Sequence, residues 1–159
     1  MEARGSPQDV WKAIRSHRIA MLATEEDGRL VSRPMASYGH PEDGRIYFIT
    51  QLDNSIARPG QAVPVNLSYA DTDKNNYLSV SGTARMSQDR QKLHELWSVW
   101  SEAWLPQGPD AKDVALIAVE PDNAKLWDAS SKLIYDARLL KAAATQTTPD
   151  EGKVKMVEM

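Results

Sequence analysis

Two β-rich runs stand out in the pattern of apolar and polar positions along the chain. Residues 30–38 and residues 46–50 are rich in β-branched, aromatic and other apolar side chains, and they flank the tetrapeptide Pro41-Glu42-Asp43-Gly44. Pro, Asp and Gly in this order favour a reverse turn. The two runs are therefore predicted to be adjacent antiparallel strands of a sheet with one buried face.

Further strands are predicted from short apolar runs and from period-two alternation. Gly82 falls inside one of them and indicates a bulge or a close approach of two backbones. Pro121 and Asn123 are predicted to turn the chain into the short segment 124–127. Short strands joined by turns at this spacing indicate a closed or nearly closed antiparallel barrel. These strands are expected at residues 19–23, 63–70, 77–86 and 114–119.

Two helices are predicted around this barrel. Ser6 is a candidate cap and Pro7 suits the first helical position, so the first helix is expected to end near Ser16. A second helix is expected to open at Ser87 and Asp89. Its apolar stripe is predicted to pack on the core rather than to stack on a cofactor. The stripe consists of Leu93, Trp97, Trp100 and Trp104.

Composition narrows the class of protein. A chain of 159 residues suits one domain, expected at residues 1–140, and the polar end over 141–159 predicts a flexible tail. Cysteine is absent, the net charge is −3, and no apolar run reaches the length of a membrane span. We therefore expect a cytoplasmic protein without a nucleic-acid or membrane partner. No metal-ligand motif is complete, so no metal site is predicted.

The candidate chemistry centres on Arg33. A guanidinium in the middle of a strand, next to Pro34, is costly to bury without an anionic partner. Thr50 and Ser55 follow near the end of the next predicted strand and would add hydroxyl donors, which together with Arg33 could hold a phosphate. A mid-strand Arg more commonly pairs with a carboxylate or reaches solvent. The residues alone leave both alternatives open.

Nine short segments between Val10 and Asp128 resemble, in order, the FMN-binding split-barrel superfamily of pyridoxamine 5'-phosphate oxidase, and within it the small bacterial general stress protein subgroup. The resemblance implies a mainly β fold with α (α+β), a six- to seven-stranded antiparallel split β-barrel flanked by helices. The segments are Arg18–Thr24, Asp27–Gly28, Ser32–Met35, Tyr47–Thr50, Val65–Ala70, Val80–Ala84, Leu96–Trp97, Ala103–Gly108 and Leu126–Asp128.

The resemblance also implies a cofactor and a partner. Members of the superfamily hold FMN in a groove between two subunits, so a homodimer with flavin at the interface is expected, with FMN rather than FAD or a deazaflavin. Arg33, Thr50 and Ser55 match phosphate ligands, and Arg58 stands near the position of a family Lys. The matches to contacts with the flavin ring are Pro34, Met35, Phe48, Ile49 and, from the other subunit, Trp127.

The substrate signature of the oxidases is incomplete in this chain. It contains Arg, Leu, His, Asp and Arg after the late Trp, whereas residues 132–138 read Lys-Leu-Ile-Tyr-Asp-Ala-Arg and lack the His. Pyridoxamine 5'-phosphate oxidase activity is therefore not expected. The resemblance favours an FMN-binding general stress protein with possible flavin redox activity. The alternatives are a true flavin- or deazaflavin-dependent oxidase or reductase on a small substrate, and a cofactor-free interaction module in which Arg33 is paired with a carboxylate.

Overall fold

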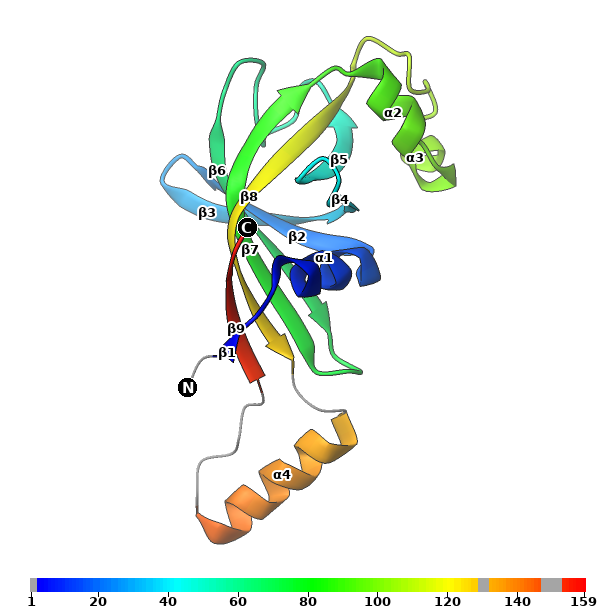
Figure 1. The fold of residues 1–159 in the computed structure, drawn as a ribbon. Coiled ribbons are helices and arrows are strands. Elements are labelled where there is room, and N and C mark those ends of the chain that lie inside the picture. Colours follow the sequence, from blue (N-terminus) through cyan, green and yellow to red (C-terminus); the bar gives the residue numbers. More distant parts are fainter. Residues whose placement is uncertain (1–2, 129–131, 147–152) are drawn as a thin grey trace.

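A computed structural model describes residues 3–128, 132–146 and 153–159, and within them the chain forms nine strands and four helices (Figure 1). The sheet runs in the order β1-β9-β8-β7-β6-β2-β3, with β5 on the free edge of β8 and β4 beside β5. All pairs are antiparallel except β1 with β9. In chain order the elements are β1 (Ala3–Arg4), α1 (Pro7–Ser16), β2 (Ile19–Glu26), β3 (Arg29–Ala36), β4 (Tyr38–His40), β5 (Arg45–Gln51), β6 (Val63–Asp71), β7 (Asn76–Ser87), α2 (Arg90–Leu96), α3 (Val99–Trp104), β8 (Val114–Asp128), α4 (Lys132–Thr145) and β9 (Lys153–Glu158).

Strand β8 organises the sheet. It pairs with β7 along one edge, while on the other edge its first half pairs with β5 and its second half with β9. The described strands thus curl around a core without closing, which confirms the predicted split-barrel architecture with more strands than expected. The predicted turn at Pro121 and Asn123 is wrong, because β8 continues through both residues. The irregularity is a bulge opposite Gly82, as that residue predicts.

The pairing of the two β-rich runs differs from the prediction. Strand β3 pairs with β2 along its whole length, and only the short β4 pairs with β5. Asp27 and Gly28 connect β2 to β3 with φ angles of 51° and 76°, which is the left-handed pair that a tight type I′ hairpin requires. The turn over residues 41–44 is confirmed, with Gly44 N donating to Pro41 O at 3.1 Å. That turn joins β4 to β5, so the adjacency predicted for residues 30–38 is wrong for β3.

The helices follow their local signals only in part. Helix α1 begins after Ser6 with the predicted cap, in which Ser6 and Asp9 exchange side-chain and backbone hydrogen bonds. The second predicted helix breaks at Ser98 into α2 and α3. Because of this break Trp100 and Trp104 are 53% and 82% exposed, so the predicted packing of the whole stripe on the core is wrong.

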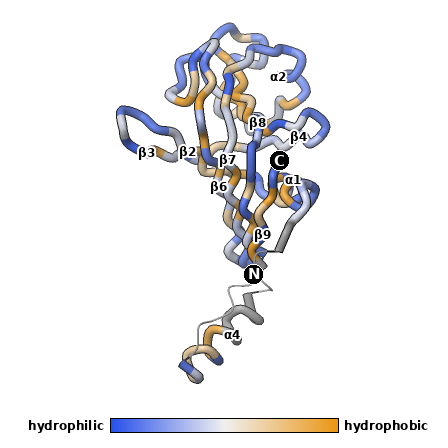
Figure 2. The backbone as a smooth tube through the Cα atoms, turned by 60° about the vertical axis from the view of Figure 1, so that its left-hand side comes forward, coloured by the Kyte–Doolittle hydropathy of each residue, from blue (hydrophilic) through white to orange (hydrophobic). Residues whose placement is uncertain are grey.

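Two hydrophobic clusters form the core. The larger fills the inside of the curled sheet and includes Leu22 and Phe48, and the smaller lies between α2 and the opposite face of β5 and β8, around Leu93 and Leu116. Hydrophobic stretches accordingly follow the strands, and hydrophilic stretches the connecting loops (Figure 2). Residues 19–23 form the predicted strand, as part of β2. Although this run is apolar throughout, the residues of β2 alternate in exposure, which leaves one face of the strand open to solvent.

The C-terminal region also differs from the expected flexible tail over 141–159. Residues 141–145 belong to α4, and 153–158 form β9, which is hydrogen-bonded to both β8 and β1. Residues 147–152 lie outside the described part of the chain. None of the described helices combines the length and apolar character needed to cross a lipid bilayer.

Candidate functional site

The hairpin of β2 and β3 places Arg33 in a small polar cluster. Arg33 lies directly opposite Leu22, so its side chain belongs to the core-facing side of the sheet, as do Thr24 and Glu26 on the neighbouring strand. The guanidinium Nη2 donates to Thr24 Oγ1 at 3.0 Å and forms an ion pair with Glu26 Oε1. The Thr24 hydroxyl in turn donates to Glu26 Oε1 at 3.1 Å. The three side chains therefore form a closed hydrogen-bonded ring, here called the Arg33 cluster.

The Arg33 cluster sits at the boundary between core and solvent. Thr24 is only 2% exposed, while the side chains of Arg33 and Glu26 are 21% and 32% exposed. The second terminal nitrogen of the guanidinium, Nη1, is shielded from water and has no hydrogen-bond partner in the described part of the chain. The carboxylate pairing that the cofactor-free alternative requires is thus present. The guanidinium nevertheless retains unused donor capacity.

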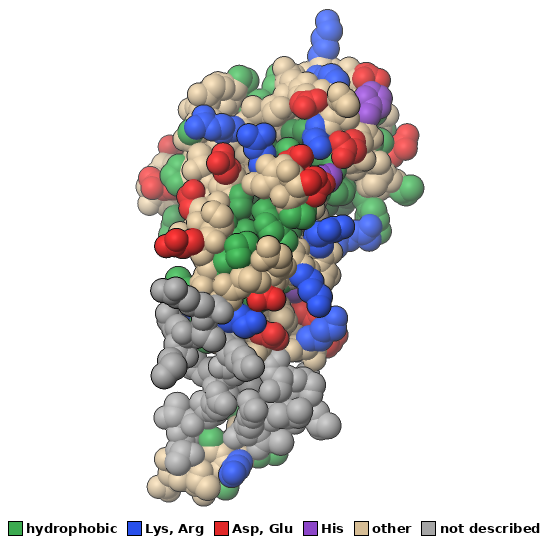
Figure 3. Space-filling model, in the orientation of Figure 1, with side chains coloured by type: hydrophobic (Ala, Val, Ile, Leu, Met, Phe, Trp, Pro, Cys, Tyr) green, Lys and Arg blue, Asp and Glu red, His purple; other side chains and the backbone are tan. Residues whose placement is uncertain are grey.

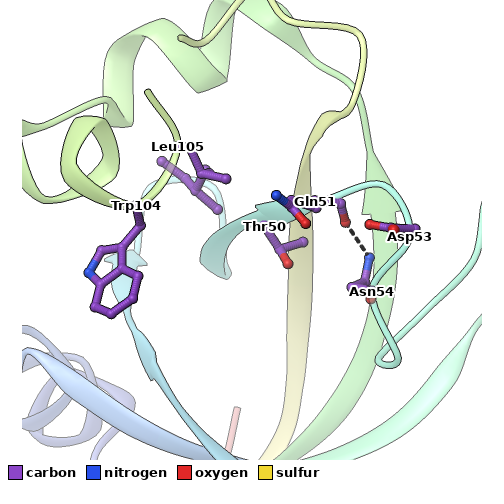
Figure 4. Close-up of a pocket in the computed structure, with 7 residues that line it drawn as sticks. Thr50, Gln51, Asp53, Asn54, Trp104 and Leu105 are labelled. Carbon is purple, nitrogen blue, oxygen red and sulfur yellow. Dashed lines mark hydrogen bonds between the residues drawn. The ribbon is translucent and has the colours of Figure 1, made fainter. Parts of the chain in front are cut away.

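A pocket of about 340 Å³ opens at the end of β5 (Figure 4). Trp104 stands on one side of it, and Thr50 with the loop after β5 stands on the other. Asn54 shapes this loop, because its Oδ1 accepts hydrogen bonds from the backbone of Ile56 and Ala57 at 2.8 and 3.0 Å. Asp53 is the charged residue of the lining. The pocket is lined by Ile49, Thr50, Gln51, Asp53, Asn54, Trp104 and Leu105.

The structure places the residues predicted to contact the flavin ring on different faces. Met35 shares the core-facing side of β3 with Arg33 and packs against the larger core cluster, whereas Pro34 lies on the opposite side. Phe48 is fully buried inside the sheet, so it has no open path to a ligand within this chain. Ile49 is partly exposed and lines the pocket.

The predicted phosphate ligands are divided between two elements. Thr50 and Arg33 both lie on core-facing sides of their strands, but Arg33 is not among the residues that line the pocket with Thr50. Ser55 and Arg58 are exposed in the loop after β5, and the backbone N of Arg58 donates to Gln61 Oε1 at 3.1 Å. The structure therefore brings Thr50, Ser55 and Arg58 to one loop region and holds Arg33 separately with Glu26.

Trp127 lies far from these residues within one chain. Thr50 pairs with Ala115 on β8, and Trp127 is twelve positions farther along the same strand. At about 3.3 Å per residue this is roughly 40 Å along the strand. Three strands also lie between β3, which carries Arg33, and β8. The predicted contribution of Trp127 to the same site therefore requires a second subunit.

Sequence reasoning missed Thr24 and Glu26 as partners of Arg33. The dipeptide Asp27-Gly28 is among the strongest short-range hairpin signals, and it fixes the register between β2 and β3. In that register Thr24 and Glu26 fall on the face of Arg33, within reach of its long side chain. The position of Trp104 beside the pocket carries no comparable signal, because it depends on the break between α2 and α3.

The titratable groups with resolved pKa shifts lie away from the Arg33 cluster. Burial raises the pKa of Tyr69 to about 12, although a hydrogen bond with Ser37 at 2.7 Å partly opposes this effect. Hydrogen bonds from Lys92 and Tyr47 lower the pKa of Asp43. Across residues 3–128, 132–146 and 153–159, no group of three or more His, Cys, Asp or Glu residues is placed to hold a metal. The side chains of residues 132–138, where the oxidase signature would fall, lie outside the described set.

Comparisons of the sequence and of the structure with known proteins point to the same family. The family model described as pyridoxamine 5'-phosphate oxidase like matches residues 6–150. General stress protein 26 of Bacillus subtilis (strain 168) is 26% identical over 137 residues, covering 83% of this chain and 95% of the relative. A structure from Jannaschia sp. CCS1, assigned as general stress protein 26, has a TM-score of 0.75 at 26% identity and covers 96% of this chain and 97% of that one. The general stress FMN/FAD binding protein from Xanthomonas citri is 31% identical, with a TM-score of 0.67 and coverage of 79% and 89%.

Proposed function

Since the chain belongs to the pyridoxamine 5'-phosphate oxidase-like family, we propose that it is a cytoplasmic general stress protein that binds FMN. The relative from Xanthomonas citri, described as FMN/FAD binding, supports a flavin as the ligand. The observation that carries the proposal is Arg33, a partly buried guanidinium whose Nη1 has no hydrogen-bond partner in the described residues. A phosphate oxygen is a suitable acceptor for this donor, because Arg recognises phosphate through paired hydrogen bonds.

The residues of this chain would bind and orient the cofactor. Arg33 would hold the phosphate by charge-assisted hydrogen bonds. Thr50, Ser55 and Arg58 lie apart from Arg33 in the single chain, around the end of β5, so they would add hydroxyl donors and a second positive charge only if ligand binding or a second subunit brings the two groups together. Ile49, which lines the pocket at the end of β5, offers apolar surface for a planar ring, whereas Met35 packs against the larger core cluster on the other face. When bound, a flavin itself supplies the redox chemistry. We therefore propose that any oxidoreductase activity on a small substrate depends on the cofactor and not on an acid or base of the chain.

We propose a homodimer as the functional form. Ile19 and Met21 are 48% and 40% exposed on the outer side of β2, although residues of this size and character are usually covered. In the view of Figure 3, hydrophobic side chains lie at the centre of one face between charged side chains of both signs. A second copy would cover the exposed apolar side chains of the sheet. It would also allow Trp127 of one subunit to approach Thr50 of the other, which the single chain holds far from it.

The test is the change in flavin affinity caused by Arg33→Ala. FMN binding is expected to weaken by roughly 1.5–3 kcal/mol, or about 10- to 100-fold, because hydrogen bonds to charged groups contribute that much. Riboflavin lacks the phosphate and should bind equally well to the variant and to the wild type. Arg85→Ala is the matched control, because it removes the same charge from an exposed position on β7, which is not a neighbour of β3 in the sheet. Equal loss of FMN and riboflavin affinity would contradict the phosphate assignment.

A cofactor-free interaction module is the second candidate, and the ion pair between Arg33 and Glu26 is the observation that favours it. In that case the pair is a structural contact and the cluster has no ligand. The visible absorption spectrum of the purified protein, recorded before and after addition of FMN and removal of excess ligand, separates the two candidates. Flavin absorbance that stays with the protein supports the first, and its absence at every FMN concentration supports the second.

A further inference from the structure

We propose that Glu26 determines which flavin the site accepts, by competing with the flavin phosphate for the guanidinium of Arg33. The inference rests on the proposed function, because it concerns the same site. Glu26 Oε1 receives both the Arg33 ion pair and the 3.1 Å hydrogen bond from Thr24. A phosphate that engages Arg33 fully must displace this carboxylate or share the guanidinium with it.

The geometry lets Glu26 compete with a bound phosphate for the guanidinium of Arg33. Arg33 Nη2 is committed to Thr24 and Glu26, which leaves Nη1 as the terminal nitrogen without a partner in the described residues. The formal charges of the Arg33 and Glu26 side chains cancel, so an approaching anion meets a neutral cluster instead of a cation. Displacing Glu26 would also remove the acceptor of the Thr24 hydroxyl, which is almost fully buried. Both effects weaken the binding of a phosphate at this position.

The competition is expected to depend on ligand charge. The terminal phosphate of FMN carries close to two negative charges at neutral pH, because the second pKa of a phosphate monoester is about 6. Repulsion by a carboxylate a few ångströms away scales with that charge. Riboflavin carries no phosphate and is not repelled. Glu26 should therefore narrow the difference in affinity between FMN and riboflavin that Arg33 alone would create.

The alternative is that Glu26 only holds Arg33 in place, and Glu26→Gln distinguishes the two roles. Glutamine keeps the shape of the side chain and an oxygen acceptor for Thr24 and Arg33, but it removes the charge. If Glu26 competes, the variant should bind FMN more tightly. If Glu26 merely positions Arg33, the weaker contact should leave FMN binding unchanged or weaker.

The experiment is equilibrium dialysis of the full chain against FMN and, separately, riboflavin, at fixed ionic strength and pH 7. The competitor role predicts that Glu26→Gln binds FMN about 10- to 100-fold more tightly than the wild type, while the affinity for riboflavin stays the same. Glu120→Gln is the matched control. It removes the same charge from an exposed residue of β8, outside the Arg33 cluster and the outer side of β2, and should change neither affinity. Glu26→Ala provides a second variant if the glutamine form does not fold.

An unchanged ratio of FMN to riboflavin affinity in Glu26→Gln overturns the inference, and so does weaker FMN binding. An equal gain in Glu120→Gln overturns it as well, because the effect would then be one of overall charge. Binding of neither flavin by the wild type or by any variant is a different result. It would refute the proposed function itself, whereas the preceding outcomes leave flavin binding intact.

Discussion

Gly82 lies where the backbones of β7 and β8 approach each other closely, and Gly82→Ala tests how rigid that contact is. A Cβ atom added to Gly82 would overlap the carbonyl oxygen of Glu120 and lie 3.0 Å from the Cα of Pro121. Both obstacles are backbone atoms of the paired strand, so rotation of a side chain cannot relieve the overlap. The two strands would have to separate at the bulge that bends the sheet.

The expected cost follows from two opposing effects. Overpacking in a well-packed site costs about 1–3 kcal/mol, and the upper half of that range applies because the neighbours are backbone. Replacing Gly with Ala lowers the entropy of the unfolded chain, which offsets about 0.4–1 kcal/mol. We therefore expect Gly82→Ala to lower the free energy of unfolding by about 1–2 kcal/mol and Tm by roughly 2–8 °C.

Urea denaturation followed by far-UV circular dichroism measures this change. Arg85→Ala is the control, since it alters an exposed residue of the same strand and should change the free energy of unfolding by less than about 0.5 kcal/mol. A loss below about 0.5 kcal/mol for Gly82→Ala would refute the reasoning. It would mean that β7 and β8 can separate at the bulge without measurable cost.

Three further predictions address assembly, activity and pH dependence. Sedimentation at low micromolar concentration is expected to give a dimer, and a monomer that still retains flavin would contradict this. FMN-loaded protein incubated with pyridoxamine 5'-phosphate in air is expected to give negligible aldehyde and peroxide. The reason is that Lys132 stands where the oxidases have Arg, and Lys lacks the two-pronged geometry with which Arg binds phosphate. Turnover near about 10 per second would show that this prediction is wrong. Because burial raises the pKa of Tyr69 from 10.0 to about 12, its stabilising contribution is complete below pH 10 and falls as pH rises toward 12, by up to about 3 kcal/mol. Denaturation series at pH 9 to 12 should therefore show a smaller alkaline loss for Tyr69→Phe than for the wild type, and equal losses would refute the assignment.

Local signals in the sequence determined the features that depend on a few neighbouring residues. Ser6, Pro7 and Asp9 specify the start of α1, because the cap satisfies amide groups that no other part of the helix can satisfy. The alternation over residues 63–70 specifies β6, since side chains on a strand must alternate between core and solvent. Gly82 likewise predicted the close approach, because a residue without Cβ is needed there.

The tertiary structure decided what depends on distant parts of the chain. Several strands could pair with β3, and only the folded sheet selects β2. The turn between residues 30–38 and 46–50 brings β4, and not β3, into register with β5. The exposure of Trp100 and Trp104 depends on where the chain breaks between α2 and α3 and on the surface available to them. Strand β9 pairs with β8 and buries Val157 in the core, although the polar end of the chain predicted a flexible tail, because the second half of β8 offers an unpaired edge.

In the candidate site, too, the sequence determined one part and the tertiary structure decided the other. The sequence singled out Arg33 as a guanidinium that needs an anionic partner, for the physical reason that an unpaired charge is costly to bury. It left open whether the partner is a ligand or a side chain of the protein. The register of β2 against β3 supplies Glu26 as a partner and leaves Nη1 without one in the described residues, and that register is a property of the paired strands and not of either strand alone. The pairing of β2 with β3 therefore places a carboxylate beside Arg33, and under the proposed function this carboxylate would compete with a flavin phosphate for the guanidinium.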